Sequence, residues 1–257
     1  MFWSAGLLLT PLMALPLVVL VGGGDRMRSI AIWLALSVGA VAAGFAFSHF
    51  AVDLPAFDYS WRHLAWLAGV TMLVGGLGLA MEPRFLCDTL SAVFRMVTER
   101  TGRAITWLVF AMALVQFAVV ILRYVFGLNF IAMQESVTYM HGAVFLLAAG
   151  YALLTDDHVR VDIFYREAPP RRKALVDLIG VYLFLFPFCL LILWTAAPYV
   201  AQAWSVREGS TEQSGIQGVF LLKTLIPMFA VLLAMAGFVA AARAAQMLKA
   251  GPPGEAA

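Results

Sequence analysis

The stretch that decides the fold of this chain is Met133–Lys173, MQESVTYMHGAVFLLAAGYALLTDDHVRVDIFYREAPPRRK. It begins with polar residues, continues as a mostly apolar segment of helix length, and ends in a charged loop that is interrupted by prolines. This pattern is typical of a membrane crossing that leads to a loop on the cytoplasmic surface. The stretch contains no pattern of an enzyme nucleophile, a general base or a phosphate-binding loop. We therefore expect the chain before it to arrive on the opposite side of a membrane.

The composition excludes an ordinary soluble domain. Of the 257 residues, 63% are hydrophobic and 12% are charged, whereas about a quarter of the residues are charged in a typical soluble protein. Each helix that crosses a membrane needs roughly 20 apolar residues, and the apolar runs have this length. The net charge of +2 gives no reason to expect a nucleic-acid partner. Cys87 and Cys189 are too far apart in sequence to suggest a disulfide or metal framework.

The apolar runs predict an all-α, polytopic membrane protein with about seven transmembrane helices. The expected crossings are residues 4–21, 29–50, 62–81, 104–126, 133–154, 174–203 and 219–242. The polar residues 82–103 form either a short amphipathic surface helix, at 91–103, or a solvated linker. The sixth crossing is long enough to require tilt, and we expect Pro187 and Pro198 to bend it.

The distribution of Lys and Arg predicts the orientation. Most of the 17 basic residues fall in four segments that would all be cytoplasmic if the N-terminus were outside; these residues are Arg26, Arg28, Arg84, Arg95, Arg100, Arg103, Arg160, Arg166, Arg171, Arg172, Lys173, Arg243 and Lys249. Basic residues are enriched on the cytoplasmic side of membrane proteins. We therefore expect a periplasmic N-terminus and a cytoplasmic C-terminus in a bacterial inner membrane.

Short motifs follow one another in order along the last four crossings. They are Arg123-Tyr124-Val125-Phe126, Gln134-Glu135-Ser136, His158-Val159-Arg160-Val161-Asp162, Pro170-Arg171-Arg172, Arg207-Glu208-Gly209-Ser210, Glu212-Gln213-Ser214, Lys223 and Pro227. With these motifs, residues 95–248 resemble the small membrane subunit of tripartite ATP-independent periplasmic (TRAP) transporters, the DctQ family. The usual small subunit has four crossings. We therefore expect residues 1–85 to be an N-terminal extension with three helices and residues 95–248 to be the four-helix domain.

The resemblance implies one part of a secondary transporter. A periplasmic solute-binding protein would deliver an organic acid or a related solute. A large, DctM-like permease subunit would hold the transport and sodium sites and move like an elevator. The small subunit would be a scaffold in the lipid bilayer that uses no cofactor, hydrolyses no ATP and is not an enzyme.

Five residues are candidates for subunit-interface or structural polar contacts. Glu135 lies about a turn from the predicted outer surface. The alternatives for it are a structural ion pair or interfacial contact, a direct role in ion or proton transport, and simple exposure. Arg123 and Lys223 are its candidate partners, unless both extend to lipid headgroups. Arg160 and Asp162 belong either to a solvated loop or to charge-assisted hydrogen bonds with helix ends of this chain or of the large subunit.

Three further residues are candidates for docking the binding protein. Glu208, Glu212 and Ser214 lie in the last outer loop, where acidic side chains could steer a basic surface of the partner. An ordinary polar turn is the alternative for the same residues.

A haem- or quinone-binding anchor subunit of a respiratory complex is the alternative function. It needs axial histidines at matching depth. The chain has His49, His63, His141 and His158; only His63 and His141 lie in or near crossings, and their depths differ. An anchor or chaperone of an unrelated complex is a third possibility.

Overall fold

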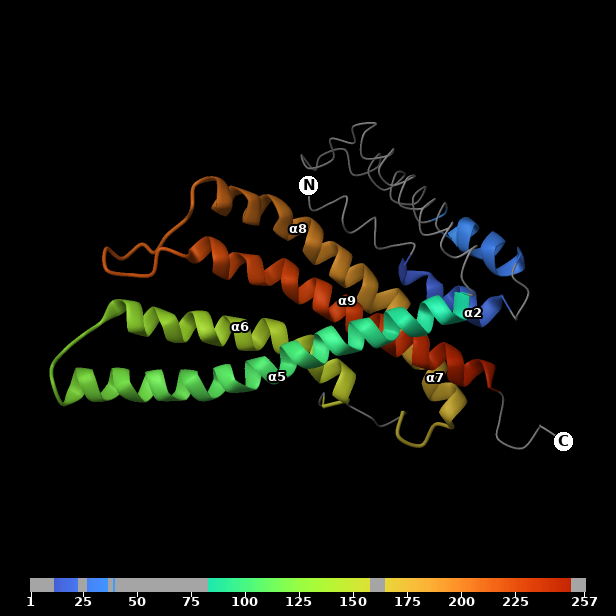
Figure 1. The fold of residues 1–257 in the computed structure, drawn as a ribbon, viewed down its shortest axis with the longest axis horizontal. Coiled ribbons are helices and arrows are strands. Elements are labelled where there is room, and N and C mark those ends of the chain that lie inside the picture. The colour runs from blue at the N-terminus through green and yellow to red at the C-terminus, as the bar shows by residue number, and fades with distance from the viewer. Residues whose placement is uncertain (1–11, 23–26, 37–38, 40–82, 158–164, 251–257) are drawn as a thin grey trace. The chain divides into compact units, whose positions relative to one another are not determined.

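The structure is a computed structural model, and it describes residues 12–22, 27–36, 39, 83–157 and 165–250 (Figure 1). All regular elements in these ranges are helical, which agrees with the all-α fold class. They are α2 (Leu15–Val21), α5 (Pro83–Tyr124), α6 (Ile131–Thr155), α7 (Pro170–Gly180), the π-helical turn η1 (Val181–Leu185), α8 (Phe186–Ser205) and α9 (Val219–Lys249). A shorter apolar helix covers Met27–Leu36.

Four helical segments are long and apolar enough to cross a membrane. They are Arg84–Tyr124, Ile131–Thr155, Pro170–Ser205 and Val219–Lys249. These segments confirm the last four crossings expected from the sequence. The first three expected crossings lie largely outside the described residues, so the total of seven and the division between residues 1–85 and 95–248 stay predictions.

Helix α5 differs from the expectation for residues 82–103. These residues form neither a separate surface helix nor a linker, because α5 runs without interruption from Pro83 to Tyr124. Proline stands only at its start, where the missing N–H costs no helical hydrogen bond. Within this segment Arg103 and Glu99 form an i,i+4 ion pair of 3.6 Å, a pairing that supports a helix. The polar residues therefore continue the helix beyond its apolar part.

The sixth crossing contains a change of helical register where a proline was expected to disturb it. The π-helical turn η1 joins α7 to α8 immediately before Pro187. Pro187 has no N–H to donate to the carbonyl of Leu183, which lies within η1. Prolines and π-bulges are both recognised causes of irregularity in helices. Pro198 lies inside α8 without ending it.

The described residues divide into two compact units. Unit 1 contains residues up to 94 together with 165–187 and 238–250, and unit 2 contains residues 95–157 and 188–237. In unit 1 the N-terminal segment is fastened to the later helices by two hydrogen bonds. Tyr182 Oη donates to the Met13 carbonyl at 2.5 Å, and Lys249 Nζ donates to the Val19 carbonyl at 3.3 Å. Residues 12–22 thus pack against η1 and the end of α9 within unit 1.

Unit 2 depends on glycines where its helices approach closely. A Cβ on Gly150 of α6 would lie 2.8 Å from the Leu232 carbonyl oxygen of α9, and a Cβ on Gly102 of α5 would lie 2.6 Å from Tyr151 Cδ2 of α6. Small residues allow membrane helices to pack backbone against backbone. The loops that join α5 to α6 and α8 to α9 lie at the same end of unit 2 (Figure 1).

Candidate functional site

A cluster of polar contacts lies where α6 begins and the loop of residues 206–218 folds over it, within unit 2. Glu135 stands in the first turns of α6, and its Oε2 accepts the backbone N–H of Ile216 at 2.6 Å. Its Oε1 accepts the hydroxyl of Ser210. A Cβ on Gly215 would lie 2.7 Å from Glu135 Oε1, so a larger residue there would displace the Glu135 carboxylate.

The loop around Glu135 is further ordered by its own hydrogen bonds. Ser210 Oγ accepts the N–H of Glu212 at 3.1 Å, and the N–H of Gly215 donates to the Glu212 carbonyl at 3.1 Å. Tyr139 Oη, one turn after Glu135, donates to the Ile216 carbonyl at 3.5 Å. Hydrogen bonds to a charged acceptor are shorter and stronger than neutral ones. Glu135 therefore anchors both sides of the loop.

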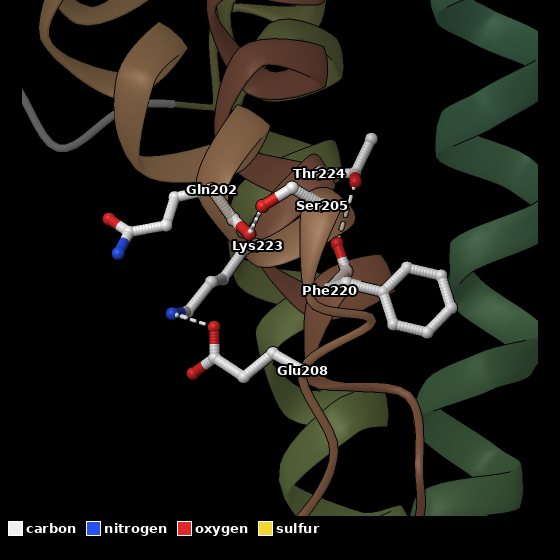
Figure 2. A network of polar contacts seen from close by, with 6 residues as sticks. All are labelled: Gln202, Ser205, Glu208, Phe220, Lys223 and Thr224. Carbon is white, nitrogen blue, oxygen red and sulfur yellow. Dashed lines mark hydrogen bonds and ion pairs between the residues drawn. The ribbon is translucent and has the colours of Figure 1, made fainter.

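A second anchor is the ion pair of Lys223 and Glu208 (Figure 2). Lys223 Nζ lies 2.5 Å from Glu208 Oε2 and 4.0 Å from the centroid of the Tyr199 ring. The backbone N–H of Phe220 donates to the Glu208 carbonyl at 3.2 Å, which brings Glu208 back to the start of α9. A carboxylate and an aromatic face together stabilise an ammonium group in an otherwise apolar helix.

Aromatic and hydroxyl side chains hold α8 and α9 together beside this ion pair. Trp204 Nε1 donates to Thr224 Oγ1 at 2.8 Å, and the Trp204 and Phe220 rings meet edge to face at 4.8 Å. Figure 2 shows Thr224 donating in turn to the Phe220 carbonyl, at 2.8 Å. On α8, Ser205 Oγ donates to the Gln202 carbonyl at 2.7 Å (Figure 2).

The structure corrects the expected ion pair of Glu135. Lys223 pairs with Glu208 rather than with Glu135, because the loop folds Glu208 back toward the first turns of α9. The Arg123 guanidinium lies 6.0 Å from the ring centroid of its neighbour Tyr124. The partners of Glu135 are instead a hydroxyl and a backbone amide of the loop.

The three candidate docking residues occupy different environments. Glu208 is partly buried and engaged by Lys223, whereas Glu212 and Ser214 are exposed at the tip of the loop. The remaining two candidates, Arg160 and Asp162, lie outside the described residues.

Sequence reasoning missed Ser210, Ile216 and Tyr199 as parts of this site. Ser210 was visible as a member of a motif, but its partner was not. Ile216 contributes its backbone N–H and carbonyl rather than its side chain, and any residue other than proline carries both groups. Tyr199 belongs to the end of the sixth crossing, where an aromatic residue is unremarkable as an interfacial side chain.

The described residues contain no group of three or more His, Cys, Asp or Glu side chains that could hold a metal ion. Of the four histidines, only His141 falls in these ranges, and its ring stacks on Phe145 with the centroids 6.5 Å apart. The other three histidines, His49, His63 and His158, lie outside the described residues.

A sequence model of the family described as tripartite ATP-independent periplasmic transporters, DctQ component, matches residues 112–247. No curated protein matches the chain, and no solved structure does. The matched range is more than half of the 257 residues. It includes most of the apolar part of α5, all of α6 to α8, nearly all of α9 and every residue of the polar cluster.

Proposed function

The chain belongs to the family of DctQ components of tripartite ATP-independent periplasmic transporters, and from this membership we propose that it is the small permease subunit of such a transporter. Members of this family are transporter components rather than enzymes. In our proposal the chain is a multi-pass inner-membrane scaffold for a large, DctM-like elevator permease. A sodium gradient drives uptake of an organic acid or related solute that a periplasmic binding protein delivers.

The family match over α6 to α9 carries this proposal, and the polar cluster supports it. Ionisable residues inside membrane segments often mark substrate or ion pathways. Here the carboxylates of Glu135 and Glu208 and the ammonium group of Lys223 all have partners within the chain. Charged groups that are paired within the chain hold the helices and the loop in place, which is the task of a scaffold.

We propose that the loop of residues 206–218 faces the periplasm and presents its tip to the binding protein. The exposed residues Thr211–Ser214 form this tip, and Glu212 supplies its acidic side chain. Because Lys223 neutralises Glu208, the electrostatic steering expected for this loop depends on Glu212. The N-terminus would then be periplasmic and the C-terminus cytoplasmic.

Arg160 and Asp162 are proposed to contact helix ends of this chain or of the large subunit at the cytoplasmic surface. A planar guanidinium and a carboxylate suit backbone groups at helix ends. If this is correct, Asp162→Ala reduces the amount of assembled complex without changing which solute is transported.

Solute uptake in proteoliposomes tests the proposal. Vesicles that contain the large subunit and this chain should accumulate the solute only when the binding protein and an inward sodium gradient are both present. Vesicles without this chain should accumulate little. Full uptake without this chain would contradict the proposed scaffold role. Uptake driven by a proton gradient alone would contradict sodium as the coupling ion.

A further inference from the structure

The two loops at the same end of unit 2 have opposite character. The loop of residues 206–218 carries polar and charged side chains and is held by Glu135 and Lys223. The loop between α5 and α6 exposes large apolar side chains almost without interruption. The exposed residues at this position are Tyr124, Val125, Phe126, Leu128 and Phe130. Val125 and Phe126 are 66% and 64% exposed, which is unusual for a turn that faces water.

Local hydrogen bonds and a glycine shape the α5–α6 loop. Gly127 has φ +69°, a conformation that favours glycine, and the Leu128 N–H donates to the Leu122 carbonyl at 2.9 Å. Asn129 Oδ1 accepts the side-chain amide of Gln134. These hydrogen bonds order the turn, and its apolar side chains lie on the outside.

The position of this loop indicates what covers these side chains. It directly joins Tyr124, the end of one membrane-spanning helix, to Ile131, the start of the next. It therefore lies at the boundary of the hydrocarbon layer. The exposed apolar surface also continues along α5 through Phe117 and Val120. Aromatic side chains are enriched in this zone, and Arg123, which precedes the turn, can extend its charge toward lipid phosphates while its stem stays in the apolar layer.

We propose that residues 124–130 form an aromatic anchor that inserts into the lipid interface, beside a polar loop that remains in water. The anchor would fix the depth of α5 and α6 in the membrane. By fixing α6 it would also fix the height of Glu135 and of the loop that Glu135 holds. This inference depends on the membrane-spanning character of α5 and α6 and not on the transported solute.

Collision of a nitroxide label with oxygen or with a water-soluble nickel chelate tests the anchor. Phe126→Cys and, as a matched control at the same end, Ser214→Cys are labelled in the full chain. The labelled chain is reconstituted, with the subunits that co-purify with it, into vesicles of phosphatidylethanolamine and phosphatidylglycerol. Cys87 and Cys189 are 3% and 0% exposed, so the label reports the introduced cysteine.

The proposal predicts that the label at position 126 collides with oxygen several-fold more often, relative to nickel, than the label at position 214. Equal access of nickel to both labels would place the loop in water and overturn the proposal. Poor access of both reagents to position 126 would show that a protein covers it, which also overturns the proposal. Val125→Cys repeats the measurement on the same turn if the variant at Phe126 does not insert.

Discussion

At the residue scale, the acidic side chain of Glu135, near the start of a membrane helix, holds a loop in place. Its two oxygens take one hydroxyl and one backbone N–H from a loop that lies 75 and 81 residues further along the chain. Carboxylates accept several hydrogen bonds at once, so one residue can hold two points of a loop. Its sequence position predicted a structural ion pair or interfacial contact, but the candidate partner Lys223 pairs with Glu208 instead.

The first prediction concerns this anchor. Glu135→Ala removes both acceptors, and loss of hydrogen bonds to a charged group typically costs about 1.5–3 kcal/mol each. We expect the amides of residues 206–218 to exchange hydrogen faster in the variant, while α6 remains helical because alanine is a good helix former. Hydrogen exchange followed by mass spectrometry checks this. Glu212→Ala, at the exposed tip, is the control; equal exchange in both variants would argue against the anchor.

The second prediction concerns the ion pair of Lys223 and Glu208. Reversing one charge, in Lys223→Glu or in Glu208→Lys, places like charges together and should lower the yield of folded protein in mild detergent. The double reversal should restore much of that yield, because the pair is direct at 2.5 Å. Size-exclusion chromatography gives the yield. The contrasting variant combines Lys223→Glu with Glu135→Lys. If this combination restored the yield instead, Lys223 would pair with Glu135 rather than with Glu208.

At the element scale, the length of α5 is the feature that sequence reasoning did not anticipate. Its 42 residues span about 63 Å at 1.5 Å per residue, roughly twice the thickness of a hydrocarbon core. Apolar runs mark where a helix crosses lipid, but they do not mark where it ends in water. The four crossings were therefore predictable, while the polar start of α5 was not, because hydrogen bonding within a helix continues through polar residues that contain no breaker.

The third prediction concerns the close approach of α6 and α9. Gly150→Ala places a methyl group 2.8 Å from a backbone oxygen, so the helices must separate, and overpacking of this kind costs about 1–3 kcal/mol. The matched control is Gly180→Ala, because a Cβ at Gly180 meets no atom within 4 Å and alanine favours a helix. Thermal unfolding in detergent should show a lower midpoint for the first variant and no loss for the second. An unchanged unfolding midpoint in the Gly150→Ala variant would mean that α6 and α9 do not meet at this position.

At the scale of the whole molecule, the membrane class, the family and the last four crossings could be read from the sequence. Their signals are long apolar runs and ordered motifs, which are properties of the chain alone. The polar cluster could be read only in part. Glu135, Glu208 and Lys223 were identified as important, but their partners depend on how a loop folds between α8 and α9. The backbone amide of Ile216 carries no sequence signal for such a role.

The fourth prediction concerns the orientation of the whole chain. A membrane-impermeant maleimide should label Ser214→Cys in intact spheroplasts, because the loop tip is exposed and is proposed to face the periplasm. Arg171→Cys, exposed at the start of α7, should react only after the membrane is permeabilised. The native thiols of Cys87 and Cys189 are buried, so background labelling should be low. The reverse labelling pattern would invert the proposed topology.

Co-purification tests the central claim most directly. The tagged chain is extracted from native membranes in mild detergent, and the proteins that accompany it are identified by mass spectrometry. The scaffold role predicts a large membrane partner with about a dozen crossings and no ATP-binding motif, and a loss of this partner when Asp162 is replaced by alanine. Recovery of the chain alone, or together with haem or a redox subunit, would contradict the account.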